Sequence, residues 1–146
     1  MIELSRTKCK SIVPGPIVLG LYPLQLGLGK SPWHVAVASM LLCRTRQVQA
    51  EPVLRELLDR WPWAQVMAVS EGLEGVVKPC GLHRNRARQL QRFSVAWLGD
   101  SWNTMEDLPG VGVYVADAVR VFCFDGMEVL SKDRVLLDYV SKRVHI

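Results

Sequence analysis

Residues 108–114 read Leu-Pro-Gly-Val-Gly-Val-Tyr, and the fold predicted for the chain depends mainly on this stretch. Two glycines, Gly110 and Gly112, let a chain turn tightly and bring bare backbone close to a partner. The apolar segment Val113–Phe124 predicts a helix directly after them, and the first N–H groups of a helix favour an anion. A lone G-x-G turn is more often an ordinary helix connection, so a phosphate-binding hairpin needs support from its surroundings.

The remainder of the chain from residue 31 onward has a helical pattern. Apolar residues recur at helical spacing, and no segment alternates with the period of a strand. Ser31 and Pro32 are typical of a helix N-cap followed by proline at the first helical position. Helices are expected at Trp33–Leu42, Gln47–Trp61, Trp63–Val69, Glu71–Val77, Asn85–Trp97, Trp102–Asp107, Val113–Phe124 and Ser131–Val144. The sequence thus predicts one all-α domain over residues 31–146.

Residues 1–30 are expected to form an irregular N-terminal arm that packs its apolar side chains on this domain. Residues 11–29 carry no charge, but three prolines and four glycines interrupt them too often for a membrane-spanning helix or a signal peptide. The chain has 146 residues, of which 49% are hydrophobic and 22% charged, which is enough for a packed core. The four cysteines lie far apart, so reduced thiols in an intracellular protein are expected.

Asp133 follows Gly112 by 21 residues and lies in the first turn of the last predicted helix. It shares a helical face with four apolar residues, Leu136, Leu137, Val140 and Val144. An inward-facing carboxylate at the head of an apolar stripe needs a chemical reason. The alternative is a first-turn carboxylate that only stabilises the helix dipole.

This hairpin, with an aspartate at that spacing, resembles the endonuclease III and adenine/thymine glycosylase superfamily of helix-hairpin-helix proteins. Within it, residues 31–146 most resemble the mismatch-specific thymine glycosylase domain that is joined to methyl-CpG-binding domains. Five motifs carry the likeness in order: Pro32-Trp33, Arg44-Thr45, Pro52-Val53-Leu54, Lys78-Pro79-Cys80-Gly81-Leu82, and Tyr114 with Phe122-Cys123.

The resemblance implies a two-lobed helical fold with its active site in the cleft between the lobes. It implies that Asp133 and Tyr114 are catalytic, with Tyr114 against the flipped base. It also implies that Leu82 is an apolar wedge in the DNA stack, and that Arg44 fills the vacated space. The resemblance further implies DNA contacts from Gly110, Val111, Gly112 and Arg86, and a monovalent cation on the carbonyls of Leu108 and Val111. A solvated helix face is the alternative for Arg84, Arg86, Arg88 and Arg92.

Three departures from the superfamily pattern shape the functional prediction. Tyr114 stands where strand-cleaving members have a lysine, which favours a monofunctional glycosylase. No four-cysteine motif follows the last helix, so no iron–sulfur cluster or other cofactor is expected. Val135 stands where the nearest relatives have a basic residue, which leaves the target base open.

The prediction is therefore a monomeric DNA N-glycosylase that acts on a mismatched or modified pyrimidine, of thymine or uracil type, in double-stranded DNA. Its partner would be duplex DNA and not a membrane, and its place the cytoplasm and nucleoid, or the nucleus. Three alternatives stay open: a bifunctional glycosylase/lyase, a phage-type enzyme that modifies thymine or hydroxymethyluracil, and a non-catalytic DNA-binding module.

Overall fold

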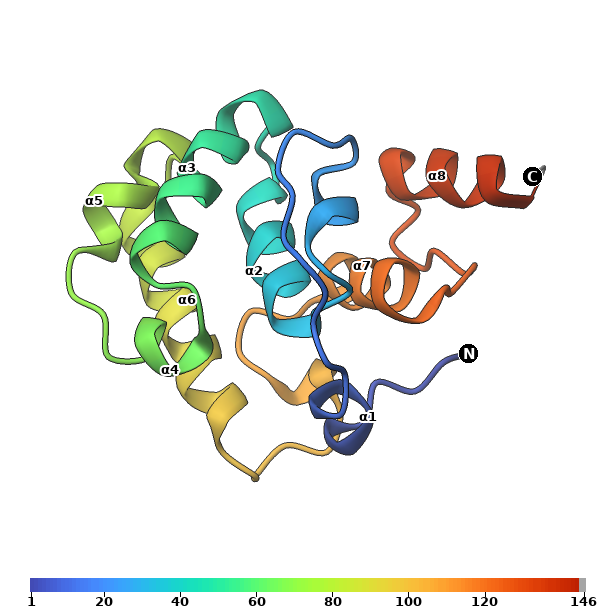
Figure 1. Cartoon of the computed structure of the whole chain (residues 1–146), viewed down its shortest axis with the longest axis horizontal. Helices are drawn as coiled ribbons and strands as arrows, with labels where there is room; N and C mark the ends of the chain where they lie inside the picture. The colour runs from blue at the N-terminus through green and yellow to red at the C-terminus, as the bar shows by residue number, and fades with distance from the viewer. Residues whose placement is uncertain (145–146) are drawn as a thin grey trace.

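A computed structural model describes residues 1–144, and most of these residues are helical (Figure 1). The α-helices are α1 (Arg6–Lys10), α2 (Pro32–Leu42), α3 (Gln47–Arg60), α4 (Ala64–Met67), α5 (Leu73–Val77), α6 (His83–Leu98), α7 (Val113–Phe124) and α8 (Arg134–Val144). Three short 3₁₀ helices are η1 (Leu24–Gly27), η2 (Lys78–Cys80) and η3 (Met105–Asp107). Two isolated β-bridges are the only strand-like pairing within the described residues. The all-α prediction is confirmed.

Helix α2 forms the centre of the molecule. All its residues from Pro32 to Leu41 are buried, and it packs against α3, α6 and α7. A helix that is apolar on every side belongs inside a core. Its start is as predicted: Ser31 is the N-cap, its hydroxyl accepts the N–H of His34, and Pro32 opens the helix.

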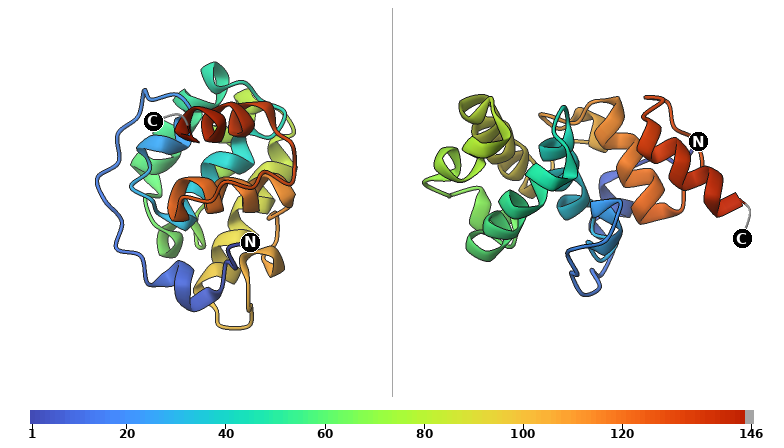
Figure 2. Two further views of the ribbon diagram at one scale, coloured as in Figure 1. Left: turned by 90° about the vertical axis from the view of Figure 1, so that its right-hand side faces the viewer. Right: turned by 90° about the horizontal axis from the view of Figure 1, so that it is seen from above.

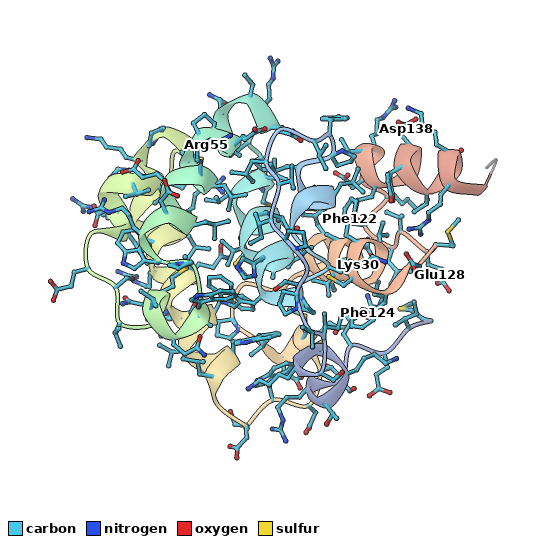
Figure 3. All side chains as sticks on the ribbon, viewed as in Figure 1. Lys30, Arg55, Phe122, Phe124, Glu128 and Asp138 are labelled. Atoms are coloured by element: carbon cyan, nitrogen blue, oxygen red, sulfur yellow. The ribbon has the colours of Figure 1, made fainter. Side chains whose placement is uncertain are left out.

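Two groups of helices lie on either side of α2, as the view from above shows (Figure 2). Helices α3 to α6 form one lobe, and α7, α8 and α1 form the other. In the second lobe the Phe122 ring, labelled on α7 in Figure 3, packs 5.0 Å from the Tyr139 ring of α8. The two-lobed arrangement agrees with the predicted fold class.

Residues 1–30 contain more regular structure than the irregular arm that we expected. They include α1 and η1, and Leu4, Leu24 and Leu28 are fully buried. The Arg120 side chain of α7 donates to the Ile2 carbonyl at 2.7 Å, and the Met105 N–H donates to the Leu4 carbonyl at 2.9 Å. The beginning of the chain is therefore built into the second lobe.

The predicted helix bounds are wrong mainly where a loop residue has a positive φ or pairs with a distant segment. Helix α8 begins at Arg134 and not at Ser131, because Lys132 has a positive φ of 59°. Only η3 forms within the helix predicted at Trp102–Asp107, since Thr104 pairs with Ser5 across the chain. Helices α4 and α5 are shorter than predicted, whereas α6 begins two residues earlier.

Candidate active site between the two lobes

A cavity of about 900 Å³ opens between the lobes. Its walls come from the N-terminal segment, the turn between α2 and α3, the first turns of α3, and the starts of α7 and α8. It is lined by Tyr22, Pro23, Gln25, Leu42, Arg44, Thr45, Arg46, Gln47, Val48, Gln49, Glu51, Tyr114, Asp133 and Val135. Three residues that the sequence singled out, Arg44, Tyr114 and Asp133, thus lie around one cavity.

Asp133 is the N-cap of α8. Its Oδ2 accepts the N–H of Leu136 at 3.0 Å, and its carbonyl accepts the N–H of Leu137 at 2.9 Å. The predicted apolar face is only partly right: Leu136 and Val140 are buried, but Leu137 is 41% exposed. The cap fixes the carboxylate on the cavity wall, and Oδ1 accepts no hydrogen bond from the described residues. The capping and catalytic readings of Asp133 are therefore compatible.

The loop before Asp133 is held by a second aspartate. Asp117 on α7 is 0% exposed, and its Oδ2 accepts the N–H of Ser131 at 2.7 Å. The Ser131 hydroxyl in turn accepts the N–H of Asp133 at 3.3 Å. Through these two hydrogen bonds, α7 holds the loop that precedes Asp133. Sequence analysis missed Asp117, although a charged residue within Val115–Val121 is the signal that would have found it.

Tyr114 lies deeper in the same cavity and is half-buried. The buried amide of Gln25 donates to its hydroxyl oxygen at 3.1 Å and to the Ser39 hydroxyl at 3.3 Å. Burial raises the pKa of Tyr114 to about 12, and the negative charge of Asp133 acts in the same direction. The phenol therefore keeps its proton at neutral pH and can donate it to a ligand. Gln25 was also missed, although it is the only amide in the uncharged stretch 11–29.

Two arginines that were both expected to contact DNA have different surroundings. Arg44 is exposed beside the cavity and has a positive φ of 60°. Arg86 is only 8% exposed, and its guanidinium donates to the carbonyls of Met40, Leu41 and Cys43 and to the Thr45 hydroxyl, at 2.6–3.1 Å. The prediction that Arg86 contacts phosphate is wrong in this structure, because these donors satisfy the C-terminal carbonyls of α2.

Leu82 lies at the surface and not in the core. Its side chain is 63% exposed, and it occupies the N-cap position of α6 with a φ of 47°. A large apolar residue in left-handed backbone is strained, and such strain gathers at functional sites. Leu82 therefore does not belong to the core, and the wedge assignment stays a prediction. Arg84, Arg88 and Arg92 are exposed along α6.

The hairpin joins η3 to α7. Gly110 has a φ of 82°, and the Leu108 carbonyl accepts the Val111 N–H at 3.2 Å to close the turn. Gly112 is the N-cap of α7 and supplies no side-chain cap, so the first amides of α7 are open to a ligand. Val111 is buried and offers only its backbone. The Leu108 carbonyl has a second lone pair, so a cation there is compatible with the turn and stays a prediction.

Two further properties of residues 1–144 bear on the site. They contain no group of three or more His, Cys, Asp or Glu side chains placed to hold a metal ion. None of their helices has the length and apolar character that crossing a bilayer requires.

Comparisons with known proteins find DNA glycosylases among the relatives, although no family model matches the chain. The methyl-CpG-binding domain protein 4-like protein of Arabidopsis thaliana is 34% identical over 110 residues, 74% of this chain and 25% of that protein. The thymine/uracil-DNA glycosylase of Pyrobaculum aerophilum is 31% identical over 97 residues, 60% of this chain and 42% of that protein. The adenine DNA glycosylase of Mycolicibacterium smegmatis is 28% identical over 126 residues, 80% of this chain and 42% of that protein.

The chain therefore spans between a quarter and less than half of the length of these relatives. Among solved structures, a thermostable thymine-DNA glycosylase matches with a TM-score of 0.63 at 19% identity. The match covers 84% of this chain and 57% of that one. It shows that the two chains share a fold.

Proposed function

Since the chain belongs to the helix-hairpin-helix DNA glycosylase superfamily, we propose that it is a monofunctional glycosylase of double-stranded DNA. The proposed target is a mismatched or modified pyrimidine of the thymine or uracil type. The observation that carries the proposal is the cavity around Arg44, Tyr114 and Asp133, because it joins a carboxylate, a protonated phenol and a free guanidinium. We further propose that it acts as a monomer, without a required cofactor, in the compartment that holds the DNA.

The sugar–base bond cannot be reached in a stacked duplex, so the nucleotide must turn out into a pocket. The open amides of α7 would hold a phosphate beside the cavity without reading sequence. Arg44 would support the distorted backbone, and Leu82 would enter the space that the nucleotide leaves. These contacts position the sugar at the Asp133 end of the cavity.

Asp133 would then stabilise the positive charge that develops on the sugar as the carbon–nitrogen bond breaks. The base leaves with the bonding electrons and takes up a proton from solvent, while water, oriented by the free Oδ1, adds to the anomeric carbon and gives its proton to Asp133. Tyr114 and Gln25 would hold the base by hydrogen bonds, since the phenol stays protonated. A phenol has no nitrogen with which to form an imine, so the abasic strand should stay intact.

A panel of duplexes carrying T:G, U:G, A:8-oxoguanine or 5-hydroxymethyluracil tests the proposal. Base release is scored as strand breakage after alkali, and we expect it from T:G and U:G. Release from the hydroxymethyluracil duplex alone would favour the phage-type enzyme. Tight binding without release from any duplex would favour a DNA-binding module.

Borohydride added during turnover tests whether the enzyme is monofunctional. We expect no protein–DNA adduct from the wild type, and a trapped adduct from Tyr114→Lys if that amine reaches the sugar. An adduct formed by the wild type in step with base release would contradict the proposal and point to another amine, such as Lys132.

A further inference from the structure

Tyr22 is an exposed aromatic residue at the mouth of the cavity. It lines the cavity, yet 67% of its surface is open to solvent. A ring that stays mostly exposed adds little to the stability of the fold, so packing does not explain an aromatic side chain at this position. Val48, at the start of α3, is a second exposed apolar side chain that lines the cavity.

The backbone on both sides of Tyr22 is fixed by one side chain. The amide of Gln47 donates to the Leu21 carbonyl at 2.7 Å and accepts the Leu24 N–H at 2.8 Å. The neighbouring Pro23 is buried. The ring is therefore presented from an ordered turn, and a ligand that stacks on it does not have to order the loop first.

The cavity thus has an inner phenol and an outer phenol. Tyr114 is half-buried and bonded to Gln25, whereas Tyr22 comes from a different segment at the rim. Both side chains line the same cavity. A base turned out of DNA is commonly held between aromatic or apolar side chains while its edge is hydrogen-bonded. Hydrogen-bonding groups are present at the inner end, and the outer end offers a free ring.

We propose that Tyr22 is a base-stacking residue that covers the outer face of the extruded pyrimidine. This inference rests on the proposed function, because it needs a flipped base in the cavity. Stacking of a base on an aromatic ring is lost on substitution by alanine, typically with a fall in affinity of about tenfold or more.

Two duplexes that differ only in the presence of the base test this inference. One carries 2′-fluorothymidine opposite guanine, where the fluorine opposes positive charge on the sugar and so prevents excision. The other carries a tetrahydrofuran abasic analogue at the same position. We expect Tyr22→Ala to raise the Kd about tenfold for the first duplex and less than twofold for the second. Tyr22→Phe should bind both duplexes like the wild type, since it keeps the ring.

Leu21→Ala is the matched control, because Leu21 is an exposed neighbour in the same turn that does not line the cavity. It should leave both Kd values within twofold. An equal loss of affinity by Tyr22→Ala for the two duplexes, or no loss for either, would overturn the inference. So would a base-dependent loss in Leu21→Ala, because the effect would then belong to the turn and not to the ring.

Wild-type excision of thymine from a T:G duplex is measured in parallel to separate the two hypotheses. If the wild type excises thymine and Tyr22→Ala binds normally, only the Tyr22 inference fails. Suppose instead that the wild type releases no base, but Tyr22→Ala raises the Kd for the 2′-fluorothymidine duplex and not for the abasic duplex. The glycosylase proposal then fails and the stacking inference stands.

Discussion

The molecule has two clefts that differ in size and in the hydrogen bonding of their central side chains. The cleft between the lobes contains a carboxylate oxygen of Asp133 without a partner and an Arg44 that makes no ion pair with the described residues. A second cleft, of about 380 Å³, is lined by Trp33, Trp63, Trp97 and His34.

In the second cleft the ring nitrogens of Trp33 and His34 are already paired. The Trp33 Nε1 donates to Ser94 at 3.2 Å, and both His34 nitrogens are hydrogen-bonded. From this comparison we expect unpaired charged groups, more than aromatic lining, to mark where this fold performs chemistry. We therefore expect changes in the first cleft to remove function, and changes in the second to remove stability.

The largest effect should come from Asp133→Asn. Loss of one electrostatic stabiliser of a transition state typically lowers the rate 10²- to 10³-fold. We expect that loss in single-turnover base release, with duplex affinity nearly unchanged. Asparagine can still cap α8, so the midpoint of thermal unfolding should move little. A mutant within a few-fold of the wild-type rate would remove Asp133 from the mechanism.

Trp33→Phe should show the opposite behaviour. It leaves a void in the core beside α2 and removes the hydrogen bond to Ser94, which together destabilise the fold by about 2 kcal/mol. Urea unfolding measures this loss, and base release per folded molecule should stay at the wild-type level. A stable Trp33→Phe with impaired excision would break the division between the two clefts.

The hairpin offers a finer test, because the fold requires glycine at position 110 but not at position 112. A Cβ on Gly112 would meet no atom within 4 Å, and its φ of −89° suits any residue. Gly112→Ala should therefore leave stability unchanged but weaken binding to all duplexes alike, by about tenfold, because phosphate contacts do not read sequence. Fluorescence anisotropy with matched and mismatched duplexes measures this.

Gly110→Ala is the control for that test. Its φ of 82° and a contact of 2.6 Å to the Gln89 side chain make a Cβ unfavourable in the fold itself. It should lower the unfolding midpoint as well as the affinity. A Gly112→Ala that changed base preference but not general affinity would refute the phosphate assignment.

The smallest effect should be a pH dependence of stability from His34. Burial lowers the pKa of His34 below its ordinary value of 6.5. The Pro62 carbonyl can only accept, so Nε2 carries the proton of the neutral ring, and Nδ1 accepts from Ser31. As the pH falls below 6.5, His34 becomes protonated in the unfolded chain but stays neutral in the folded chain. The free energy of unfolding therefore decreases until the pH reaches the pKa of His34 in the folded chain.

Urea unfolding of the wild type and His34→Gln between pH 7.5 and 5 measures this decrease. As the pH falls, the difference in free energy of unfolding between the two proteins should shrink by less than about 1.4 kcal/mol for each pH unit. If both proteins lost stability in parallel with falling pH, His34 would not be the group responsible.

The central parts of the fold were predictable because their signals are local. The N-cap at Ser31 and the bounds of α7 follow from turn chemistry and helical spacing, and both are confirmed. The family resemblance, carried by the hairpin and the position of Asp133, implied an acid in the cleft, and Asp133 lines the cavity between the lobes. The roles of the site residues stay predictions.

Arg86 shows that a local signal can also be misread. Arg84, Arg88 and Arg92 lie four residues apart on one face of α6, whereas Arg86 is offset by about 200° and shares its face with Leu90 and Phe93. Helical geometry alone therefore favoured a buried side chain for Arg86. It did not indicate that the guanidinium would bind the carbonyls at the end of α2.

Residues 1–30 were harder to predict because their partners are distant in sequence. Gln25 reaches Tyr114 across 89 positions, and α1 has only five residues, too few for a periodic pattern. Nothing in the local pattern distinguishes such a segment from a loop.

The contact between Ile2 and Arg120, separated by 118 positions, also sets an order of events during synthesis. A ribosome adds about 5–20 residues per second, so the first residues wait on the order of 6–24 s before their partner on α7 has been made. Throughout that interval Leu4, which is completely buried in the finished protein, has to remain exposed or find temporary cover. The second lobe can therefore close only after α7 has been made, and a chaperone that shields short apolar segments would be expected to improve the yield of folded protein.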